Sequence, residues 1–417
     1  MLRTPWYHGW NILGVAMLFQ AVSFGIGIYC FTFWVEPLSS EFAVGRGRVL
    51  LLFVSLQLTL GLLSPFAGQI IDRFELRWVI CAGACCMAAA LALTAQASSL
   101  WQIQLLFATL MVGGLLLSGP LAAQTLAARW FDRRRGLALG LSTIGTSVGG
   151  FLLPILFTSL LVSYGWRDAS GWLALLVLVV VLPPVWLVIR NSPAALGIAG
   201  EGSLPLAAGA TARVEYDWTT RQIFGSRAFW VIVCAFLPLA IAFGGAQQNL
   251  GPFAADQNIA PQRAAYLVSV LALTMVGAKV FFGALSDRID HRWLFLIATL
   301  CCFAAVLQMF GQISYGRMLL IASMLGAAAG GFLPLLGAVV SARFGTLAFA
   351  RVMGLVGPFT MMAALGPWLV ARVRDSSGSY DGAWPIMLGV LIPAFIAILF
   401  LPTPAACEAH RASLEPR

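Results

Sequence analysis

A single lysine lies inside a long apolar stretch of this sequence. Lys279 is the only lysine among 25 lysine and arginine residues. Its ammonium group is a compact point charge that suits an anionic partner such as one carboxylate. The structural alternative is a lysine whose flexible stem carries the charge to a polar boundary. We therefore expect Lys279 to bind an anionic ligand, and the structural alternative stays open.

Neutral polar side chains in other apolar stretches offer hydrogen bonds rather than charge. Tyr29 can donate to a carboxylate, and the amides of Gln124, Gln247, Gln248 and Asn249 can donate and accept. Each of these side chains can instead join two helices through a hydrogen bond. They are candidate substrate-binding residues with that alternative beside them.

The residues that enzymatic chemistry needs are missing from the apolar stretches. The sixteen carboxylates lie in loops or at stretch ends, with Glu36 nearest to an interior, and His8, His291 and His410 lie outside the stretches. A membrane-embedded protease would need a paired acid, a Ser–His pair or a zinc site at depth. The sequence therefore predicts no enzyme, no metal and no cofactor. The eight cysteines are expected to be reduced packing residues.

The elements that position these residues follow from composition. Sixty per cent of the 417 residues are apolar, 10% are charged, and the mean hydropathy is +0.90, whereas a soluble domain carries about 25% charged residues. Lipid leaves backbone groups without partners unless they form helices. We therefore expect an all-α membrane protein with twelve transmembrane helices of roughly 20 residues each. The expected spans are 10–35, 48–71, 78–98, 101–127, 136–163, 169–189, 228–250, 264–286, 293–313, 317–341, 350–371 and 383–401.

The basic residues indicate how the spans are oriented. Seventeen lie on the side that holds both termini and seven on the other, with Lys279 inside a span. Because cytoplasmic loops are enriched in lysine and arginine, both termini are expected in the cytoplasm. The net charge of +9 is spread over short clusters between spans, which is a topology signal and predicts no nucleic-acid partner.

One long polar connection divides the chain. Residues 190–227 contain Ser192, Pro193 and several glycines, a composition typical of a linker. The end of this linker is expected to form an interfacial helix. The expected domains are an N-terminal six-helix bundle over 1–189, a cytoplasmic linker over 190–227, a C-terminal six-helix bundle over 228–404, and a cytoplasmic tail over 405–417.

The two halves carry the same motif in the same register. Gly68, Asp72, Arg73 and Arg77 recur with identical spacing as Gly283, Asp287, Arg288 and Arg292. A second echo places Gly113-Gly114 and Arg129 beside Gly330-Gly331 and Arg343. Such a repeat predicts two pseudo-symmetric bundles with a cavity between them. Asp72 and Asp287 can pair with arginines and offset helix-end dipoles, or these residues can serve only as topology signals.

This duplicated motif resembles the one found in the major facilitator superfamily. The run from Arg129 to Leu141, followed by Gly145 and Gly149, is similar to the signature of its monocarboxylate transporter and oxalate:formate antiporter group, as is Tyr7-His8-Gly9-Trp10. The resemblance implies alternating access, with rearrangement of charged motif contacts at one gate. The expected gating residues are Asp72, Arg73, Arg77, Arg129, Arg133, Asp287, Arg288 and Arg292.

The resemblance also bears on the substrate. It places Lys279 at a basic position of the eighth span that pairs with a carboxylate, and Tyr29 at an aromatic position near substrate. Phe332 and Thr360 lie on helices that face the cavity in this family. The chain departs from the family pattern at two charges: Met275 stands where animal members have an aspartate, and Phe33 is near the position of their first-span lysine.

A further departure concerns the eleventh span, where the oxalate antiporter type has a second basic residue. This chain has no charge between Arg351 and Arg372, so one carboxylate suits it better than two. Coupling could come from anion exchange, from a proton on the substrate, or from titration of Lys279.

The expected function is secondary active transport of a small organic anion across a bacterial inner membrane by a monomer working in the uptake direction. One alternative is a transporter for a bulkier neutral or aromatic solute such as a metabolite, vitamin or drug. Another is a receptor with a transporter-like fold, although no signalling domain is attached.

Overall fold

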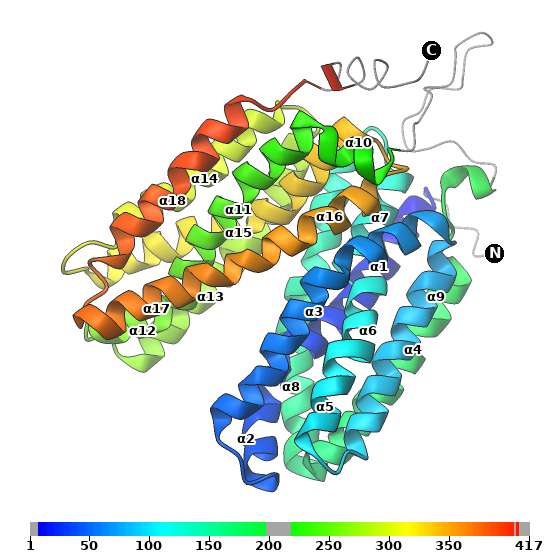
Figure 1. Cartoon of the computed structure of the whole chain (residues 1–417), viewed down its shortest axis with the longest axis horizontal. Coiled ribbons are helices and arrows are strands. Elements are labelled where there is room, and N and C mark those ends of the chain that lie inside the picture. Colours follow the sequence, from blue (N-terminus) through cyan, green and yellow to red (C-terminus); the bar gives the residue numbers. More distant parts are fainter. Residues whose placement is uncertain (1–6, 197–217, 404–405, 408–417) are drawn as a thin grey trace. The chain divides into compact units, whose positions relative to one another are not determined.

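The computed structural model describes residues 7–196, 218–403 and 406–407. Every regular element in these residues is a helix, so the all-α class is confirmed. Contacts divide the chain into two units (Figure 1). Unit 1 comprises residues 1–216 and 346–358, and unit 2 comprises residues 217–345 and 359–417.

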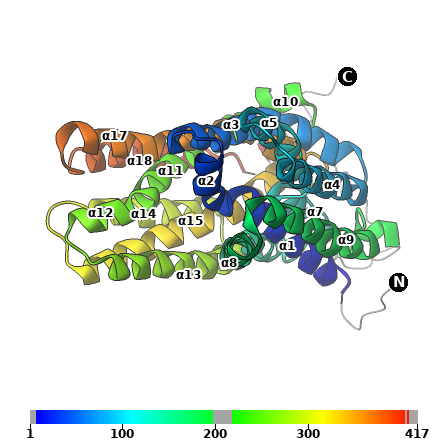
Figure 2. The same cartoon turned by 90° about the horizontal axis from the view of Figure 1, so that it is seen from below.

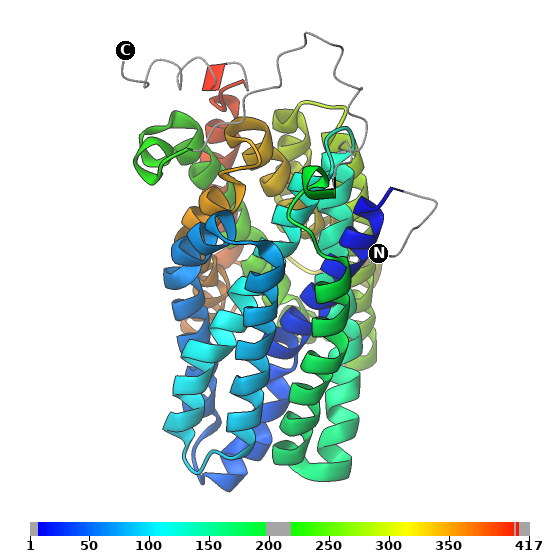
Figure 3. The same ribbon diagram turned by 90° about the vertical axis from the view of Figure 1, so that its right-hand side faces the viewer.

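Unit 1 is a bundle whose helices run along a common direction (Figure 3). Its helices are α1 (Gly9–Phe24), α2 (Phe31–Glu41), α3 (Arg46–Arg73), α4 (Leu76–Ala95), α5 (Leu100–Leu106), α6 (Val112–Leu117), α7 (Pro120–Trp130), α8 (Arg135–Leu176) and α9 (Leu182–Val188). Single π-helical turns over Gly25–Tyr29, Phe107–Met111 and Val177–Val181 continue α1 into α2, α5 into α6, and α8 into α9. Such turns widen a helix locally and are frequent at functional sites.

Unit 2 contains most of the second half of the chain (Figures 1 and 2). Its helices are α10 (Thr220–Gly225), α11 (Arg227–Gln248), α12 (Leu250–Asp256), α13 (Pro261–Ser286), α14 (His291–Leu307), α15 (Tyr315–Phe344), α17 (Leu365–Ser377) and α18 (Ala383–Leu399). Helix α16 (Phe349–Met361) is shared, because contacts assign its residues up to Pro358 to unit 1. The part of the expected linker before Trp218 is described only as far as residue 196.

The apolar helices account for the twelve expected spans. Within the described residues, nine helical stretches are long and apolar enough to cross a membrane, and α14 and α18 are shorter apolar helices. One stretch, Arg135–Val188, is 54 residues long and contains two spans, separated at Gly165. Gly165 adopts φ 77°, a value that glycine reaches without a side-chain clash. The expected ninth span ended at residue 313, but α14 ends at Leu307.

Small residues let the helices of each unit approach closely. In unit 1, a Cβ at Gly149 of α8 would overlap the carbonyl oxygen of Ala21 on α1. In unit 2, a Cβ at Gly330 of α15 would overlap the carbonyl oxygen of Met275 on α13. Membrane helices associate through such backbone approach, since lipid provides little hydrophobic drive between them. These contacts fix the helices that carry the candidate site residues.

Side-chain caps mark where several helices of unit 2 begin. Ser226 accepts from the backbone N–H of Ala228, and Asp290 accepts from that of Arg292. Thr219 and Gln222 form a reciprocal capping box at α10. Caps of this kind satisfy N–H groups that a helix start leaves without partners.

Candidate functional site

Asp72, at the end of α3, is a charged junction buried in unit 1. Its carboxylate is 3% exposed and Oδ1 accepts from the Arg129 guanidinium at 3.1 Å. Oδ2 accepts from the backbone N–H of Arg351 at 2.8 Å. That N–H lies in the first turn of α16, where helix N–H groups lack partners and the dipole favours a negative charge. One carboxylate thus joins the fourth span to the start of the eleventh.

Close packing of α3 against α16 brings this carboxylate to the helix start. A Cβ at Gly68 would overlap the Ala350 carbonyl oxygen, and one at Gly354 would overlap that of Ser64. The Ser64 hydroxyl donates to the Gly354 carbonyl at 2.7 Å. Gly68 of the motif therefore allows the backbone approach that the Asp72 contact requires.

The last arginine of each motif copy contacts the final helix of its own half. The Arg77 guanidinium lies 4.6 Å from the centre of a Trp186 ring on α9. Its counterpart Arg292 donates to the carbonyl of Leu401, just after α18. Trp186 and Leu401 are as far apart in the sequence as the two motif copies are. These two expected gating residues hold the third and sixth helices of a bundle together.

The other expected gating residues are not gathered into this junction. Asp287 is exposed, in contrast to its counterpart Asp72. Arg73, Arg133 and Arg288 are exposed as well. In unit 2, the counterpart of Arg129 is Arg343, which is 5% exposed and donates from Nε to the Pro402 carbonyl at 3.2 Å.

Lys279 is buried within unit 2, with 4% of its surface exposed. It lies on α13, seven residues before Ser286, so about 10 Å along the axis from that end of the helix. Its neighbour Ala278 and the later Phe282 pack against Gly330 and Gly331 of α15. The lysine is therefore held on a helix face fixed by close packing, and its charge lies away from water.

The hydrogen-bonding candidates lie in different environments. Tyr29 is 39% exposed at the end of a π-helical turn, with its ring against Gly150 and 5.9 Å from the Phe24 ring. Gln124, on α7, is 1% exposed, and neither of its amide atoms has a hydrogen-bond partner in the described structure. Tyr29 is therefore open to a ligand, and Gln124 is buried with its bonding capacity unused.

The three hydrogen-bonding candidates of the seventh span differ in how deeply their side chains are buried. Gln247 is half-buried and Gln248 is exposed. Asn249 is buried and donates to the carbonyls of Gly245 at 2.9 Å and Pro367 at 3.3 Å. The Asn249 amide thus ties α11 to α17, which is the structural role that the sequence left open.

Phe332 of α15 belongs to an aromatic cluster in unit 2. Its ring centre lies 5.5 Å from that of Phe236 and 5.6 Å from that of Phe243. These edge-to-face arrangements stabilise aromatic packing. Thr360 is half-buried on α16, in the part assigned to unit 2.

Each unit also has an ion pair at the end opposite its motif. In unit 1, Glu41 accepts from the guanidinium of Arg167 at 2.6 Å and from the indole of Trp166. In unit 2, Asp256 accepts from Arg374 at 2.6 Å. Glu41 and Asp256 again have the sequence separation of the motif copies, so the repeat could have revealed these pairs from the sequence. We call them the opposite-end clasps.

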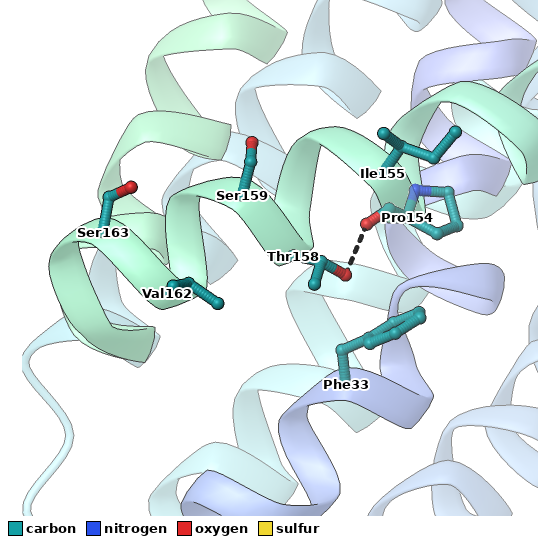
Figure 4. Close-up of a pocket in the computed structure, with 7 residues that line it drawn as sticks. All are labelled: Phe33, Pro154, Ile155, Thr158, Ser159, Val162 and Ser163. Carbon is teal, nitrogen blue, oxygen red and sulfur yellow. Dashed lines mark hydrogen bonds between the residues drawn. The ribbon is translucent and has the colours of Figure 1, made fainter.

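An open groove lies on unit 1 between α2 and α8 (Figure 4). Its volume is about 620 Å³ and its wall is mostly apolar, with Phe33 on one side and Ile155 and Val162 on the other. The Thr158 hydroxyl in this wall donates to the Pro154 carbonyl at 2.7 Å. The groove thus offers an apolar surface and few unused hydrogen-bonding groups.

Comparisons with known proteins agree with this architecture. The Major Facilitator Superfamily model matches residues 17–257 and 247–416. Human monocarboxylate transporter 11 is 27% identical over 361 residues, covering 81% of this chain and 71% of the relative. The oxalate:formate antiporter of Oxalobacter formigenes is 25% identical over 381 residues, covering 88% of this chain and 86% of the antiporter.

Two further comparisons cover nearly the whole chain. The MFS-type transporter YcxA of Bacillus subtilis is 22% identical over 420 residues, covering 98% of this chain and 96% of the relative. The solved structure of the proton:xylose symporter XylE shares the fold with a TM-score of 0.71 at 14% identity, covering 97% of this chain and 99% of that one. This chain is therefore not an enzyme but a transporter of the major facilitator superfamily, similar to its monocarboxylate transporters and oxalate:formate antiporter.

Proposed function

We propose that this transporter takes up a small organic monoanion across the bacterial inner membrane. The observation that carries the proposal is Lys279, a cation 4% exposed within an apolar helix. A charge at that depth is costly and is retained in membrane proteins chiefly for function. One ammonium matches one carboxylate, and the names of the transporters it resembles support a carboxylate solute.

The orientation and oligomeric state belong to the same proposal. The arginine distribution supports cytoplasmic termini, which places Asp72 and its contacts at the cytoplasmic end of unit 1. The chain works as a monomer, and its partners are the solute, the lipid bilayer and a coupling ion or exchanged solute. The named symporter and antiporter relatives support such a coupled partner.

The Asp72 junction serves as the cytoplasmic gate in this proposal. Residues 346–358 pack with unit 1 but are joined by the chain to unit 2 on both sides. A conformational change that draws α16 away from α3 must therefore break the hydrogen bond from the Arg351 N–H to Asp72. Arg129 shares the carboxylate, so it neutralises Asp72 when α16 leaves. The exposed Arg73, Arg133, Asp287 and Arg288 act at the motif end of their own units, and Arg77 and Arg292 keep each bundle intact.

Uptake by reconstituted liposomes tests the role of Lys279. The measurement is initial uptake of a radiolabelled monocarboxylate over a range of concentrations. Loss of one partner from a buried charge pair costs about 2–5 kcal/mol, so Lys279→Ala should lower kcat/KM at least about 30-fold. Lys279→Arg keeps the charge and should retain part of the uptake.

The matched control is Arg221→Ala, which removes an exposed cation of the same unit. It should leave uptake unchanged. Equal uptake by wild type and Lys279→Ala would refute carboxylate binding by the lysine. Saturable binding of the acid without any flux would instead identify a receptor.

A bulkier aromatic solute is a second candidate, and one feature favours it. The apolar groove beside Phe33 offers a surface to an aromatic group. Competition against labelled uptake separates the candidates. Inhibition by neutral aromatics and none by lactate-sized acids would support this second solute class.

A further inference from the structure

Among the described residues of unit 1, two buried amide side chains, Gln20 and Gln124, have unused hydrogen-bonding atoms, as does the half-buried Gln57. Gln20 of α1 is fully buried; its Nε2 donates to the Ser142 carbonyl at 3.2 Å, and its Oε1 has no partner among the described residues. Gln124 of α7 is 1% exposed, and its Nε2 and Oε1 are both without partners there. Nε2 of Gln20 is already donating, and the free atom of this side chain is its oxygen, which is an acceptor.

Helix register places the two amides close together. The Ser23 and Ser118 hydroxyls are 2.9 Å apart, and the Trp10 and Phe131 ring centres are 4.9 Å apart. The interval from Trp10 to Ser23 equals that from Ser118 to Phe131, so the antiparallel register is constant. Gln124 therefore lies opposite residue 17, three residues from Gln20, or about 4.5 Å along the axis. The two residues therefore lie on helices that pack together, at levels within one turn of each other.

Leaving these atoms unpaired is expensive. A buried polar group without a hydrogen bond costs about 1–3 kcal/mol, and a membrane bundle provides no bulk water to pair with it. Buried groups of this kind in a native structure indicate a polar occupant. An occupant that bridges the two residues has to donate to Oε1 of Gln20 and accept from Nε2 of Gln124, and Oε1 of Gln124 can accept from a further donor.

The fold itself does not require the amides. The repeat that relates Asp72 to Asp287 relates Gln20 to Ala235. Gln124 corresponds to Ala338 when both are counted back from Arg129 and from its counterpart Arg343, since each residue precedes its arginine by the same number of positions. Both alanines are buried in the corresponding helices α11 and α15. The corresponding helices of unit 2 thus pack together with alanines at these two positions. The amides of unit 1 are therefore not needed for the packing of the helices.

We propose that Gln20 and Gln124 bind a hydroxyl group of the transported solute. A hydroxyl donates one hydrogen bond and accepts others, which matches the acceptor on Gln20 and the donor on Gln124. A retained water molecule donates twice and also accepts, so it can pair with the same atoms and is the other source that the test must separate. This inference rests on the proposed transport of an organic anion and adds selection for a hydroxy acid over the acid that lacks the hydroxyl.

The test compares uptake of lactate and propionate, two monocarboxylates that differ by one hydroxyl. A site that hydrogen-bonds a substrate hydroxyl discriminates strongly against the analogue without it, because its own polar groups stay unpaired. The wild type should prefer lactate by about tenfold or more in kcat/KM. Gln20→Met and Gln124→Met should each remove most of this preference, by lowering lactate uptake more than propionate uptake. The matched control is Gln104→Met, an exposed amide on α5, which should keep the preference.

The outcomes separate the two proposals. Absence of uptake of both acids by the wild type would refute the proposed function. Uptake of both acids without a preference would refute only the hydroxyl site. An unchanged preference in well-folded Gln20→Met and Gln124→Met, with raised thermal stability, would show that the amides hold a water molecule only and would also overturn the inference.

Discussion

The two halves of this transporter differ in the burial and the identity of polar residues at corresponding positions. Asp72 and Asp287 occupy the same motif position, yet Asp72 is buried against Arg129 and the first turn of α16, whereas Asp287 is exposed. The buried amides Gln20 and Gln124 have alanines as counterparts in unit 2. Conversely, Lys279 belongs to unit 2 alone. Polar groups in the interior have thus diverged between the halves.

Other features are the same in both halves. Each motif ends in an arginine that contacts the final helix of its bundle, and each bundle has an opposite-end clasp. Each also packs its first and fifth spans through glycine, at Gly149 against Ala21 and at Gly366 against Ile241. The shared features hold a six-helix bundle together. The features that differ are those expected to close a gate or bind a solute.

The largest expected contrast concerns the duplicated carboxylate. Asp72→Ala leaves the Arg129 guanidinium and an α16 N–H without their buried acceptor, and removal of one partner of a buried pair costs about 3–5 kcal/mol. Asp287→Ala removes an exposed carboxylate and should cost less than about 1 kcal/mol. Thermal unfolding in detergent, followed by tryptophan fluorescence, measures both. Equal losses would mean that burial of Asp72 does not decide its role.

A second comparison tests the packing that the halves share. Gly149→Ala and Gly366→Ala each force a methyl group onto a neighbouring backbone carbonyl, and overpacking costs about 1–3 kcal/mol. The two losses should be similar, measured as shifts of the same unfolding midpoint. Gly171→Ala and Gly389→Ala are the controls, since nothing lies within 4 Å of a Cβ there. A large loss in only one half would contradict a shared packing scheme.

The smallest expected contrast concerns the opposite-end clasps. Arg167 also donates to the carbonyls of Ala95 and Ala97, at 2.9 Å each, so it ties three segments of unit 1. Arg374 pairs with Asp256 at a partly exposed site, where solvent screening leaves an ion pair little stabilising effect. Arg167→Ala should therefore lower the unfolding midpoint more than Arg374→Ala, by the equivalent of roughly 1–2 kcal/mol. Thermal unfolding in detergent measures both midpoints, and a larger loss in Arg374→Ala than in Arg167→Ala would refute this account.

Sequence reasoning identified the motif residues but could not assign their partners. The constant separation of the two motif copies identified Asp72 with Asp287, because register survives in a linear sequence. It could not indicate that Oδ2 of Asp72 caps α16, since that partner is a backbone N–H some 279 positions away. It also missed Gln20, because a single amide in an apolar stretch looks the same whether its atoms are paired or not.

Composition and periodicity determined that this chain is an all-helical membrane protein, because lipid leaves the backbone few other means of pairing its polar groups. The spacing of Gly, Asp and Arg determined the internal repeat, since equal spacing along a helix places equal residues on equal faces. Tertiary structure alone decided which copy of a repeated residue is buried, which hydrogen-bonding atoms are left unpaired, and which half holds the start of α16. These properties depend on neighbours that are distant in sequence, and burial sets the free energy of each charge and amide.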